Sequence, residues 1–309
     1  MQKLLTINLF GAPQVLYGDS RASKFPAEKV KLLFYYLVLF RHLKHPRSVL
    51  SGIFWGDSDE AQARHSLNTA MWRLRRWLES LQQGRASFLL FEEDQIGFNN
   101  ASPYWLDTAE FEDGITSALQ QNLSDPPLAA AALNHAVELY RGELLEGCYA
   151  DWCFAERARY QQLFHQALVH LMVYYGGQRE FAQAIVLAQR LLKDEPLRED
   201  IQRELMKLFM LDNQPAEALL QYHRCETALR EELGIKPMRE TQELFRHFVL
   251  NSAQAQTGHA LTALRAAPDL SAPSTPYLQK IDEMIEHLER ASEELRQGIE
   301  TLRQIKSVT

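Results

Sequence analysis

The chain contains 309 residues, with 33 Lys and Arg against 40 Asp and Glu, which gives a formal net charge of -7. Hydrophobic residues make up 46% of it, a composition that is ordinary for a globular protein and excludes a disordered or fibrous chain. At roughly 100–200 residues per domain, the length predicts two or three domains. An acidic chain is at first sight a poor binder of nucleic acid.

No membrane span is predicted. The longest apolar stretch, Val30 to Phe40, contains Lys31 and is far shorter than the roughly 18–20 residues that a bilayer requires. The amino-terminal residues also lack the apolar block and the cleavage site of a secretory signal. We therefore expect a cytoplasmic protein that has no association with a membrane.

The cysteines predict neither a disulfide framework nor a metal site. Cys148, Cys153 and Cys225 are odd in number, and Cys148 and Cys153 have neither a second CxxC pair nor nearby His ligands. We therefore expect reduced thiols in the core or at the surface.

Charge is divided unevenly along the chain. Residues 1–100 hold 13 basic and 9 acidic residues, a net +4, which leaves 20 basic and 31 acidic residues, a net -11, for residues 101–309. A basic amino-terminal part ahead of an acidic remainder suggests that only the first part meets an anion.

Residues 1–100 predict a winged helix-turn-helix domain. Apolar alternation over residues 4–9, followed by turn residues, is typical of strand, turn and strand. A helix is predicted from Pro26 to about Leu43, and His45-Pro46 breaks it. A short helix over Ser48–Trp55 follows, and then a longer one begins near Glu60, capped by Ser58 or Asp59.

This third helix has two distinct faces at about 100° per residue. One face is apolar and predicted to lie in the core: Ala63, Leu67, Ala70, Met71, Leu74, Leu78 and Leu81. The opposite face carries Gln62, His65, Thr69, Trp72, Arg73 and Arg76, with Arg64, Asn68 and Arg75 on its flanks. Arg can pair with guanine, Asn or Gln with adenine, and apolar atoms of Thr or Trp can touch a thymine methyl group, so this face is a candidate to read a major groove. The alternative is a solvated cationic face with Trp72 packed under the wing.

A hairpin after a helix of this kind is a candidate wing. Short strands are predicted over Phe88–Phe91 and Gln95–Phe98, with Glu92-Glu93-Asp94 as the tip between them. An acidic tip repels phosphate, so we expect Arg85, at the base of the wing, to approach the DNA backbone.

In the second domain, residues 101–255, the chain is predicted to be helical from Asp107 onward, with loops between the helices and no strand. When the chain is shifted by 34 residues, Met172 falls on Met206 and Ala184 falls on Ala218. A period of 34 is that of tetratricopeptide helix pairs, whose stacked units leave a concave face for peptides, partner domains or a small effector. Chance similarity between two amphipathic helices is the alternative.

Several segments resemble bacterial activators of the Streptomyces antibiotic regulatory protein type. LLTINLFGAPQV, the Lys29–Leu39 helix, LSGIFWGD and AQARHSLNTAMWRLRRWL are similar to the DNA-binding half of that family. LDTAEFEDGI, LYRGELLEGCYADWCFAERAR, LLKDEPLREDIQRELMKLF and ALLQYHRCETALREELGIKP are similar to its bacterial transcriptional activator domain. The resemblance covers about residues 3–250 in the domain order of the family.

The resemblance implies an OmpR-like winged helix that binds direct-repeat promoter sites in double-stranded DNA and activates transcription by contacting RNA polymerase, commonly its sigma subunit. Carried onto this chain, it implies contacts in the groove from residues of the third helix. It implies phosphate contacts from Arg47, Ser48 and Arg64, which position the protein without specifying a sequence. No GxxxxGK[ST] motif is present, so the nucleotide-binding domain of larger members is missing.

The last part of the chain predicts a linker and a coiled coil. Residues 256–276 are rich in small residues and Pro, and residues 277–309 carry a heptad pattern with Ser292 at a polar a position. The apolar a and d residues are Leu278, Ile281, Ile285, Leu288, Leu295, Ile299 and Leu302. A homodimer through this helix would favour binding to direct repeats, while docking within the chain or onto another protein's helix are alternatives.

No catalytic role is expected, because no HExxH, GxSxG or metal-ligand spacing occurs, and no cofactor is predicted. The predicted architecture is mainly α with a small β component. It consists of a winged helix-turn-helix at 1–100, a tetratricopeptide-like helical repeat domain at 101–255, a linker and a C-terminal coiled-coil helix. The predicted function is that of a sequence-specific transcriptional activator. The alternative is a repeat-based interaction or ligand-sensing scaffold without high affinity for DNA.

Overall fold

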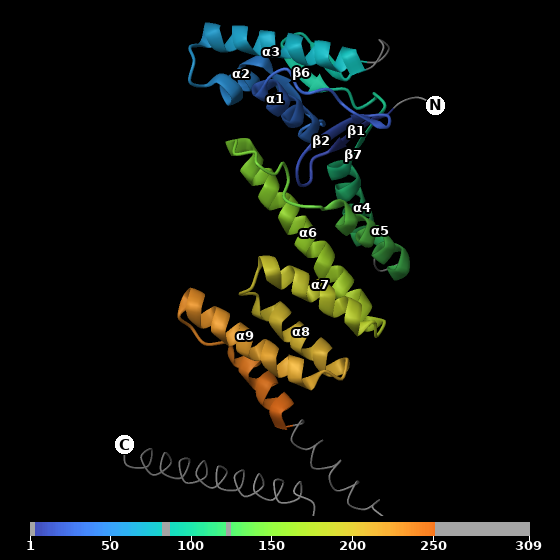
Figure 1. Ribbon diagram of the computed structural model, residues 1–309, viewed down its shortest axis with the longest axis vertical. Helices are drawn as coiled ribbons and strands as arrows, with labels where there is room; N and C mark the ends of the chain where they lie inside the picture. Colours follow the sequence, from blue (N-terminus) through green and yellow to red (C-terminus); the bar gives the residue numbers. More distant parts are fainter. Residues whose placement is uncertain (1–3, 82–86, 122–124, 251–309) are drawn as a thin grey trace, which may run out of the picture. The chain divides into compact units, whose positions relative to one another are not determined.

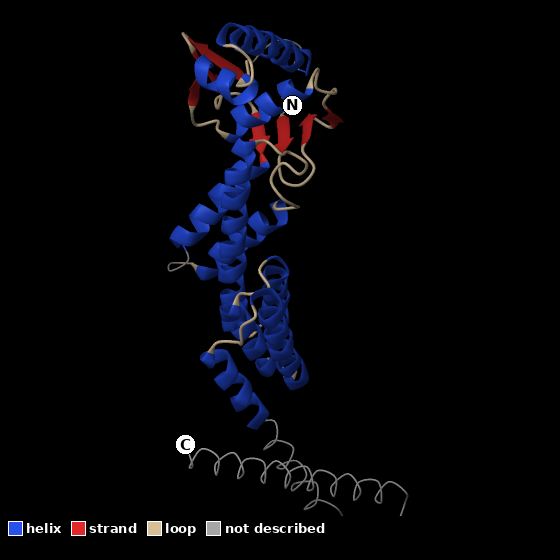
Figure 2. Cartoon of the chain, turned by 90° about the vertical axis from the view of Figure 1, so that its left-hand side faces the viewer, coloured by secondary structure: helices blue, strands red, loops and turns tan. Residues whose placement is uncertain are grey.

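The computed structural model describes residues 4–81, 87–121 and 125–250. The chain divides into two units, Met1–Phe248 and Val249–Thr309, and nearly all of the second lies outside the described residues. In the first unit helices predominate over a few short strands, so the predicted fold class, mainly α with a small β component, is confirmed (Figure 1, Figure 2). Arg85, the linker and the heptad residues Leu278 to Leu302 lie outside the described residues.

The amino-terminal residues form a sheet with the strand order β3-β2-β1-β7. Its strands are β1 (Leu5–Asn8), β2 (Gln14–Tyr17), β3 (Ser20–Arg21) and β7 (Tyr104–Leu106). β1 and β2 are the predicted antiparallel pair, whereas β7, which was not predicted, runs parallel to β1 with Ile7 opposite Leu106. A strand that follows residue 100 therefore completes the sheet with which the chain begins.

Three helices follow this hairpin: α1 (Glu28–Leu39), α2 (Arg47–Trp55) and α3 (Glu60–Leu81). The first was predicted to run to Leu43, but it ends at Leu39. The chain then forms β4 (Lys44–Pro46), which pairs with β6. His45-Pro46 thus belongs to an edge strand and also separates two helices. An edge strand tolerates proline because one side of it needs no backbone N–H donors for pairing.

A second sheet has the order β4-β6-β5 and follows the order of elements predicted for a winged helix, so we call α1 to α3 together with this sheet the winged helix. β5 (Leu89–Glu92) and β6 (Gln95–Phe98) form the predicted hairpin after α3, and we call this hairpin the wing. Ile96 and Phe98 of the wing are buried together with Leu33 and Phe34 of α1. The wing is therefore anchored to the helices through its second strand.

Helices α4 to α9 follow, and each packs against the next in the chain (Figure 1). They are α4 (Asp107–Gln121), α5 (Pro126–Leu139), α6 (Asp151–Gly177), α7 (Phe181–Asp194), α8 (Glu199–Leu211) and α9 (Pro215–Leu233). Residues 239–250, after α9, are also helical. None of the helices in the described part of the chain has both the length and the apolar character that spanning a membrane requires.

The period of 34 residues recurs in the hydrogen bonds of the turns. Between α6 and α7, Arg179 has a φ of 62° and donates from its N–H to the Gly176 carbonyl over 3.2 Å. Between α8 and α9, Asn213, which lies 34 residues later, has a φ of 58° and donates to the Met210 carbonyl over 3.2 Å. The next hydrogen bond in each turn repeats at the same interval. The N–H of Glu180 donates to the Tyr175 carbonyl over 2.9 Å, and the N–H of Gln214 donates to the Phe209 carbonyl over 2.8 Å. Two helix pairs therefore share one local geometry, as tetratricopeptide-like repeats do.

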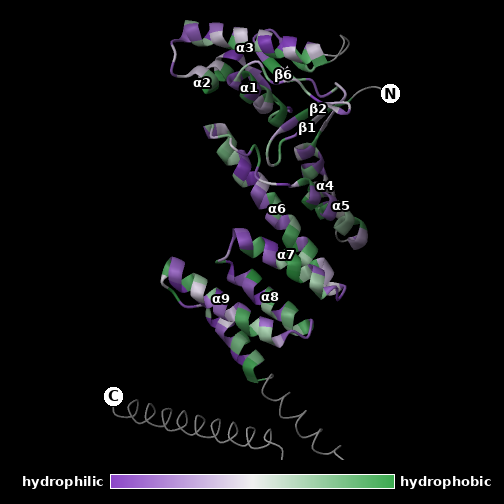
Figure 3. Ribbon diagram, in the orientation of Figure 1, coloured by the Kyte–Doolittle hydropathy of each residue, from purple (hydrophilic) through white to green (hydrophobic). Residues whose placement is uncertain are grey.

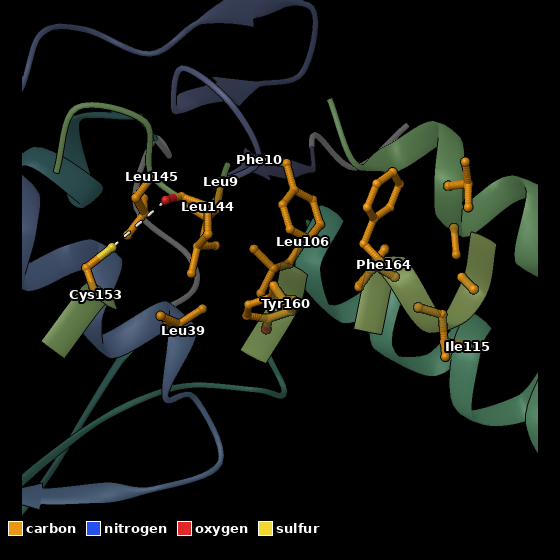
Figure 4. Close-up of a cluster of buried hydrophobic side chains, with 14 of the residues drawn as sticks. Leu9, Phe10, Leu39, Leu106, Ile115, Leu144, Leu145, Cys153, Tyr160 and Phe164 are labelled. Atoms are coloured by element: carbon orange, nitrogen blue, oxygen red, sulfur yellow. Dashed lines mark hydrogen bonds between the residues drawn. The ribbon is translucent and has the colours of Figure 1, made fainter. Parts of the chain in front are cut away.

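The first sheet and the helical repeats share one hydrophobic core (Figure 4). The ring of Phe10, just after β1, lies 5.0 Å from that of Phe111 on α4 and 5.4 Å from that of Tyr160 on α6, measured between centroids. The backbone of Leu9 also accepts a hydrogen bond of 2.8 Å from Leu145, in the loop before α6. Aromatic packing and backbone hydrogen bonds thus join the two parts at the end of β1.

Asp107, the first residue of α4, is completely buried at this junction. Its carboxylate accepts hydrogen bonds from the backbone N–H groups of Leu9 at 2.8 Å, Phe10 at 3.0 Å and Thr108 at 2.8 Å. Burial raises the pKa of Asp107, and the hydrogen bonds from these N–H groups offset part of the shift. One side chain therefore ties the start of the helical repeats to the end of β1.

Candidate DNA-binding surface

The apolar face of α3 fixes how the helix presents its other side. The side chain of Asp59 accepts a hydrogen bond of 2.9 Å from the backbone N–H of Gln62 and so caps the helix, as predicted. The predicted apolar residues are buried apart from Leu81, which is half-buried. Hydrophilic and hydrophobic residues are therefore interleaved along α3 (Figure 3).

Trp77 is part of this buried face, although it was not predicted to be. Its ring stacks on Phe25 with 4.1 Å between the centroids, and its Nε1 donates to the Ser23 carbonyl over 3.0 Å. Trp77 lies at the margin of the apolar face, and Ser23 and Phe25, which contact it, come from the loop before α1. No local pattern in the sequence could have indicated that loop as its partner.

The opposite face of α3 is exposed along the helix. Arg64, His65, Asn68, Trp72, Arg73 and Arg76 are exposed, and Thr69 is half-buried. The side chain of Trp72 is 62% exposed, so the alternative in which it packs under the wing is wrong. A large aromatic side chain left in solvent among arginines is available to a partner.

The arginines of α3 differ in their acidic partners. Arg64 pairs with Glu60 at 3.0 Å, while Glu79 lies 2.9 Å from Arg75 and 3.8 Å from Arg76. All these side chains are solvent-exposed, so each pair contributes little to stability and can open when a phosphate competes. Among the described residues, no acidic side chain lies within 4.0 Å of Arg73.

Arg47 links α2, α3 and the wing. Its Nη1 donates to Asn68 Oδ1 over 2.9 Å, and its backbone N–H donates to the Asp94 carbonyl over 2.9 Å. A groove of about 270 Å³ lies beside it and is lined by Arg47, Asn68, Met71, Trp72, Arg75 and Phe91. Arg47 therefore orients the side chain of Asn68. Ser48, the next residue in the chain, is exposed.

The acidic tip of the wing is partly neutralised by its neighbours. Lys44 on β4 pairs with Glu92, and Arg47 Nε lies 4.0 Å from Asp94 Oδ1. These pairs join the wing to the start of α2. Two of the three tip carboxylates thus have a basic partner, which weakens the repulsion that the sequence predicts.

Lys29 was not predicted to be near this surface. Together with Trp55 of α2 and His65, Thr69 and Arg73 of α3, it lines a groove of about 490 Å³ on the side of α3 that faces α1. Its Nζ donates to the Phe54 carbonyl over 2.7 Å and lies 5.3 Å from the centre of the Trp55 ring. Lys29 adds positive charge beside Arg73. The sequence alone does not indicate this, because the two residues come together only through the packing of α1 against α3.

The surface holds cations, amides and one aromatic group, but no cluster of metal ligands. Within the described ranges, no three His, Cys, Asp or Glu side chains lie close enough together to hold a metal ion. What the arrangement can do is bind an anion through arginines and contact planar bases through Asn68 and Trp72.

Comparison with known proteins identifies the second half of the molecule. Residues 106–248 match the family model of the bacterial transcriptional activator domain. The proteins named Transcriptional regulatory protein MoaR1 from Mycobacterium bovis and Mycobacterium tuberculosis are each 24% identical over 233 residues, which cover 73% of this chain and 74% of the relative.

The fold is also similar to that of a solved structure, Mycobacterium tuberculosis EmbR in complex with a low-affinity phosphopeptide. The TM-score is 0.68 at 18% sequence identity, over 85% of this chain and 71% of that chain. The similarity includes both the winged helix and the helical repeats, because 85% of the chain is more than either part contains by itself. Residues 106–248 therefore form a bacterial transcriptional activator domain, the domain that the resemblance to activators of the Streptomyces antibiotic regulatory protein type predicts for this part of the chain.

Proposed function

We propose that the chain is a sequence-specific DNA-binding activator in which α3 enters the major groove. The observation that carries this proposal is the exposed face of α3, where Trp72 and Arg73 lie in solvent beside Asn68. Arginine, amide and aromatic groups on one helix face match the donors, acceptors and methyl groups of base edges. The acidic helical repeats would be repelled by the duplex, which leaves the winged helix to dock.

The positions of the side chains on and beside α3 support two kinds of contact. Arg73 and Arg76 lie at the middle of the exposed face, where they can reach guanine, together with His65, Thr69 and Trp72. Arg47, Ser48 and Arg64 lie at its edges, where phosphates pass. Asn68 Oδ1 keeps a second lone pair while it accepts from Arg47, so its amide can still pair with adenine.

Replacing Glu79 by Gln should strengthen DNA binding. The carboxylate holds Arg75 and Arg76 and repels phosphate, so its removal should tighten binding to specific and random duplexes alike, by about 3- to 10-fold at low salt. Fluorescence anisotropy with labelled duplexes measures both affinities. Glu138→Gln, the same change at an exposed site on α5, is the matched control and should have no effect. Equal affinities for the two variants would contradict the role of Glu79.

Activation is proposed to proceed through contact with RNA polymerase, in keeping with the activator domain at residues 106–248. In run-off transcription with purified polymerase, the full chain should increase the transcript from a template that carries its selected site. A template with the site scrambled should give no increase. Binding without any increase in transcript would contradict the activator role and leave DNA recognition intact.

The proposal requires neither a cofactor nor catalysis. Protein dialysed against a metal chelator should bind its site as tightly as untreated protein.

The concave side of the helical repeats is proposed to be available to a small effector, whose effect would be a change in affinity for the site.

We also propose that the heptads in residues 278–302 form a homodimer, which would raise the affinity for direct repeats. Removal of residues 278–309 should halve the mass measured by light scattering. Leu288→Asp, at a core position, should have the same effect, whereas His287→Asp, at the adjacent position, should not. An unchanged mass in the truncated chain would contradict the dimer.

A further inference from the structure

Two of the cysteines meet at the start of α6. Cys148 lies in the loop before the helix, where its N–H donates to the Leu145 carbonyl over 2.9 Å. Cys153 lies in the first turn of α6, where its N–H donates to the Ala150 carbonyl over 2.9 Å. Both are free thiols, with Cys153 fully buried and Cys148 9% exposed.

Arg157 holds the two cysteines together. Its Nη2 donates to the Cys148 carbonyl over 2.9 Å and to Cys153 Sγ over 3.8 Å, while its Nε donates to the Leu144 carbonyl over 3.1 Å. Cys153 Sγ itself lies 3.9 Å from the Leu144 carbonyl oxygen (Figure 4). One guanidinium therefore fixes the loop of Cys148 against the helix turn of Cys153.

The two thiols are unequal. The neighbouring Cys153 side chain lowers the pKa of Cys148, and the Cys148 side chain in turn raises the pKa of Cys153. Arg157 and Lys31 lower the pKa of Cys148 further, while its burial opposes them. Cys148 therefore has the character of a nucleophile, and Cys153 that of the thiol that resolves its oxidised form.

Cys148 can be reached from solvent. It lines a cleft of about 800 Å³ between the first sheet, α1 and the loop before α6, together with Arg21, Lys24 and Lys31. The third cysteine, Cys225, is fully buried on α9, and burial raises its pKa to about 11. Cys225 therefore serves as a reference thiol within the same chain.

We propose that Cys148 and Cys153 are a redox-active pair, which hydroperoxides oxidise to an intramolecular disulfide. The Cys148 thiolate attacks one peroxide oxygen and breaks the O–O bond, which gives Cys148 sulfenic acid and hydroxide. The Cys153 sulfur then attacks the sulfenic sulfur and the S–O bond breaks. The two thiol protons leave with the two oxygens, so two thiols and one hydrogen peroxide give one disulfide and two waters.

The site lies at the junction between the winged helix and the helical repeats. The loop that carries Cys148 is hydrogen-bonded to Gly11, which lies shortly after β1. The N–H of Gly11 donates to the Glu143 carbonyl over 2.8 Å, and the N–H of Glu146 donates to the Gly11 carbonyl over 3.0 Å. The chemistry can be tested without reference to DNA binding.

Mass spectrometry of the full-length chain tests the proposal. The reduced protein is treated with hydrogen peroxide, blocked with iodoacetamide in denaturant and digested with trypsin without reduction. Cleavage after Arg141 and Arg157 releases both cysteines in one peptide, residues 142–157. This peptide should lose two hydrogen atoms, resist alkylation and recover both thiols in dithiothreitol. Cys225 should stay alkylatable at peroxide doses about tenfold higher.

Variants separate the two roles. Cys153→Ser should leave a sulfenic acid on Cys148 that dimedone traps, and Cys148→Ser should leave Cys153 reduced at the same dose. Cys225→Ser is the matched control and should form the disulfide as the wild type does. The proposal is overturned if both thiols of peptide 142–157 remain alkylatable in the wild type, if they oxidise no faster than Cys225, or if the disulfide joins two chains.

Discussion

Arg73→Ala and Arg76→Ala should each reduce binding to the specific site by about 1–3 kcal/mol, or roughly 5- to 150-fold, with much smaller losses on random duplex. Both side chains lie on the exposed face of α3, opposite the buried Leu67 and Leu74. A bidentate contact with guanine is lost only where the guanine is present, so the loss should depend on sequence. Competition of each variant between the two duplexes measures it.

Arg64→Ala is the control for these variants. Arg64 is similarly exposed and lies on the same helix, but on the flank of the face, where it pairs with Glu60 at 3.0 Å. Its removal should weaken binding to both duplexes alike, since a phosphate contact carries no sequence information. Unchanged thermal unfolding would show that all three variants keep their fold. An equal loss on the two duplexes for Arg73 and Arg76 would mean that they contact only phosphates.

Asp107→Ala should lower the free energy of unfolding by about 3–5 kcal/mol. The substitution removes the acceptor for the buried N–H groups of Leu9, Phe10 and Thr108 and leaves these donors without a partner in the core. It also releases β1 from α4, at the point where the winged helix meets the helical repeats. Denaturant unfolding followed by circular dichroism measures the change.

Two further substitutions make this result specific. Asp113→Ala changes an exposed carboxylate on the same helix and should alter stability by less than about 0.5 kcal/mol. Asp107→Asn keeps one oxygen acceptor but directs an amide group at backbone donors, so it should lie between the wild type and Asp107→Ala. A loss from Asp107→Ala no larger than that from Asp113→Ala would show that other groups satisfy the three N–H donors.

Long, periodic elements could be predicted from the sequence. The apolar face of α3 followed from its spacing, because a helix of 22 residues repeats its pattern over several turns. The period of 34 residues followed from matched positions such as Met172 with Met206 and Ala184 with Ala218, and the turn hydrogen bonds at Arg179 and Asn213 reproduce it. In both cases the local sequence pattern favours the same structure as the packing of the whole fold.

Short elements with distant partners could not be predicted. β4 and β7 have three residues each, too few for a period, and β7 pairs with a strand about 100 residues earlier. The same reason hides Trp77, whose partners Ser23 and Phe25 come from another element. The residues of the candidate DNA-binding face were accessible to sequence reasoning because they share one helix, while the pairing of Arg47 with Asn68 joins two elements.

The thiol pair shows the same limit. Cys148 and Cys153 are five residues apart, a spacing that marks neither a metal site nor a redox motif. They meet because a turn precedes α6 and because Arg157, one helical turn after Cys153, bonds to both segments. The chemistry therefore depends on a third residue that a spacing rule does not include.

In the proposed mode of binding, α3 reads a duplex while basic side chains around it hold phosphate. The most direct test measures the affinity of the full chain for a selected site and for random duplex over a series of salt concentrations. We predict that log K falls linearly with log salt on both duplexes, with a slope of about -3 to -5, and that a preference of at least about 1,000-fold for the selected site persists. An affinity that does not distinguish any duplex from random DNA at moderate salt would contradict this mode of binding.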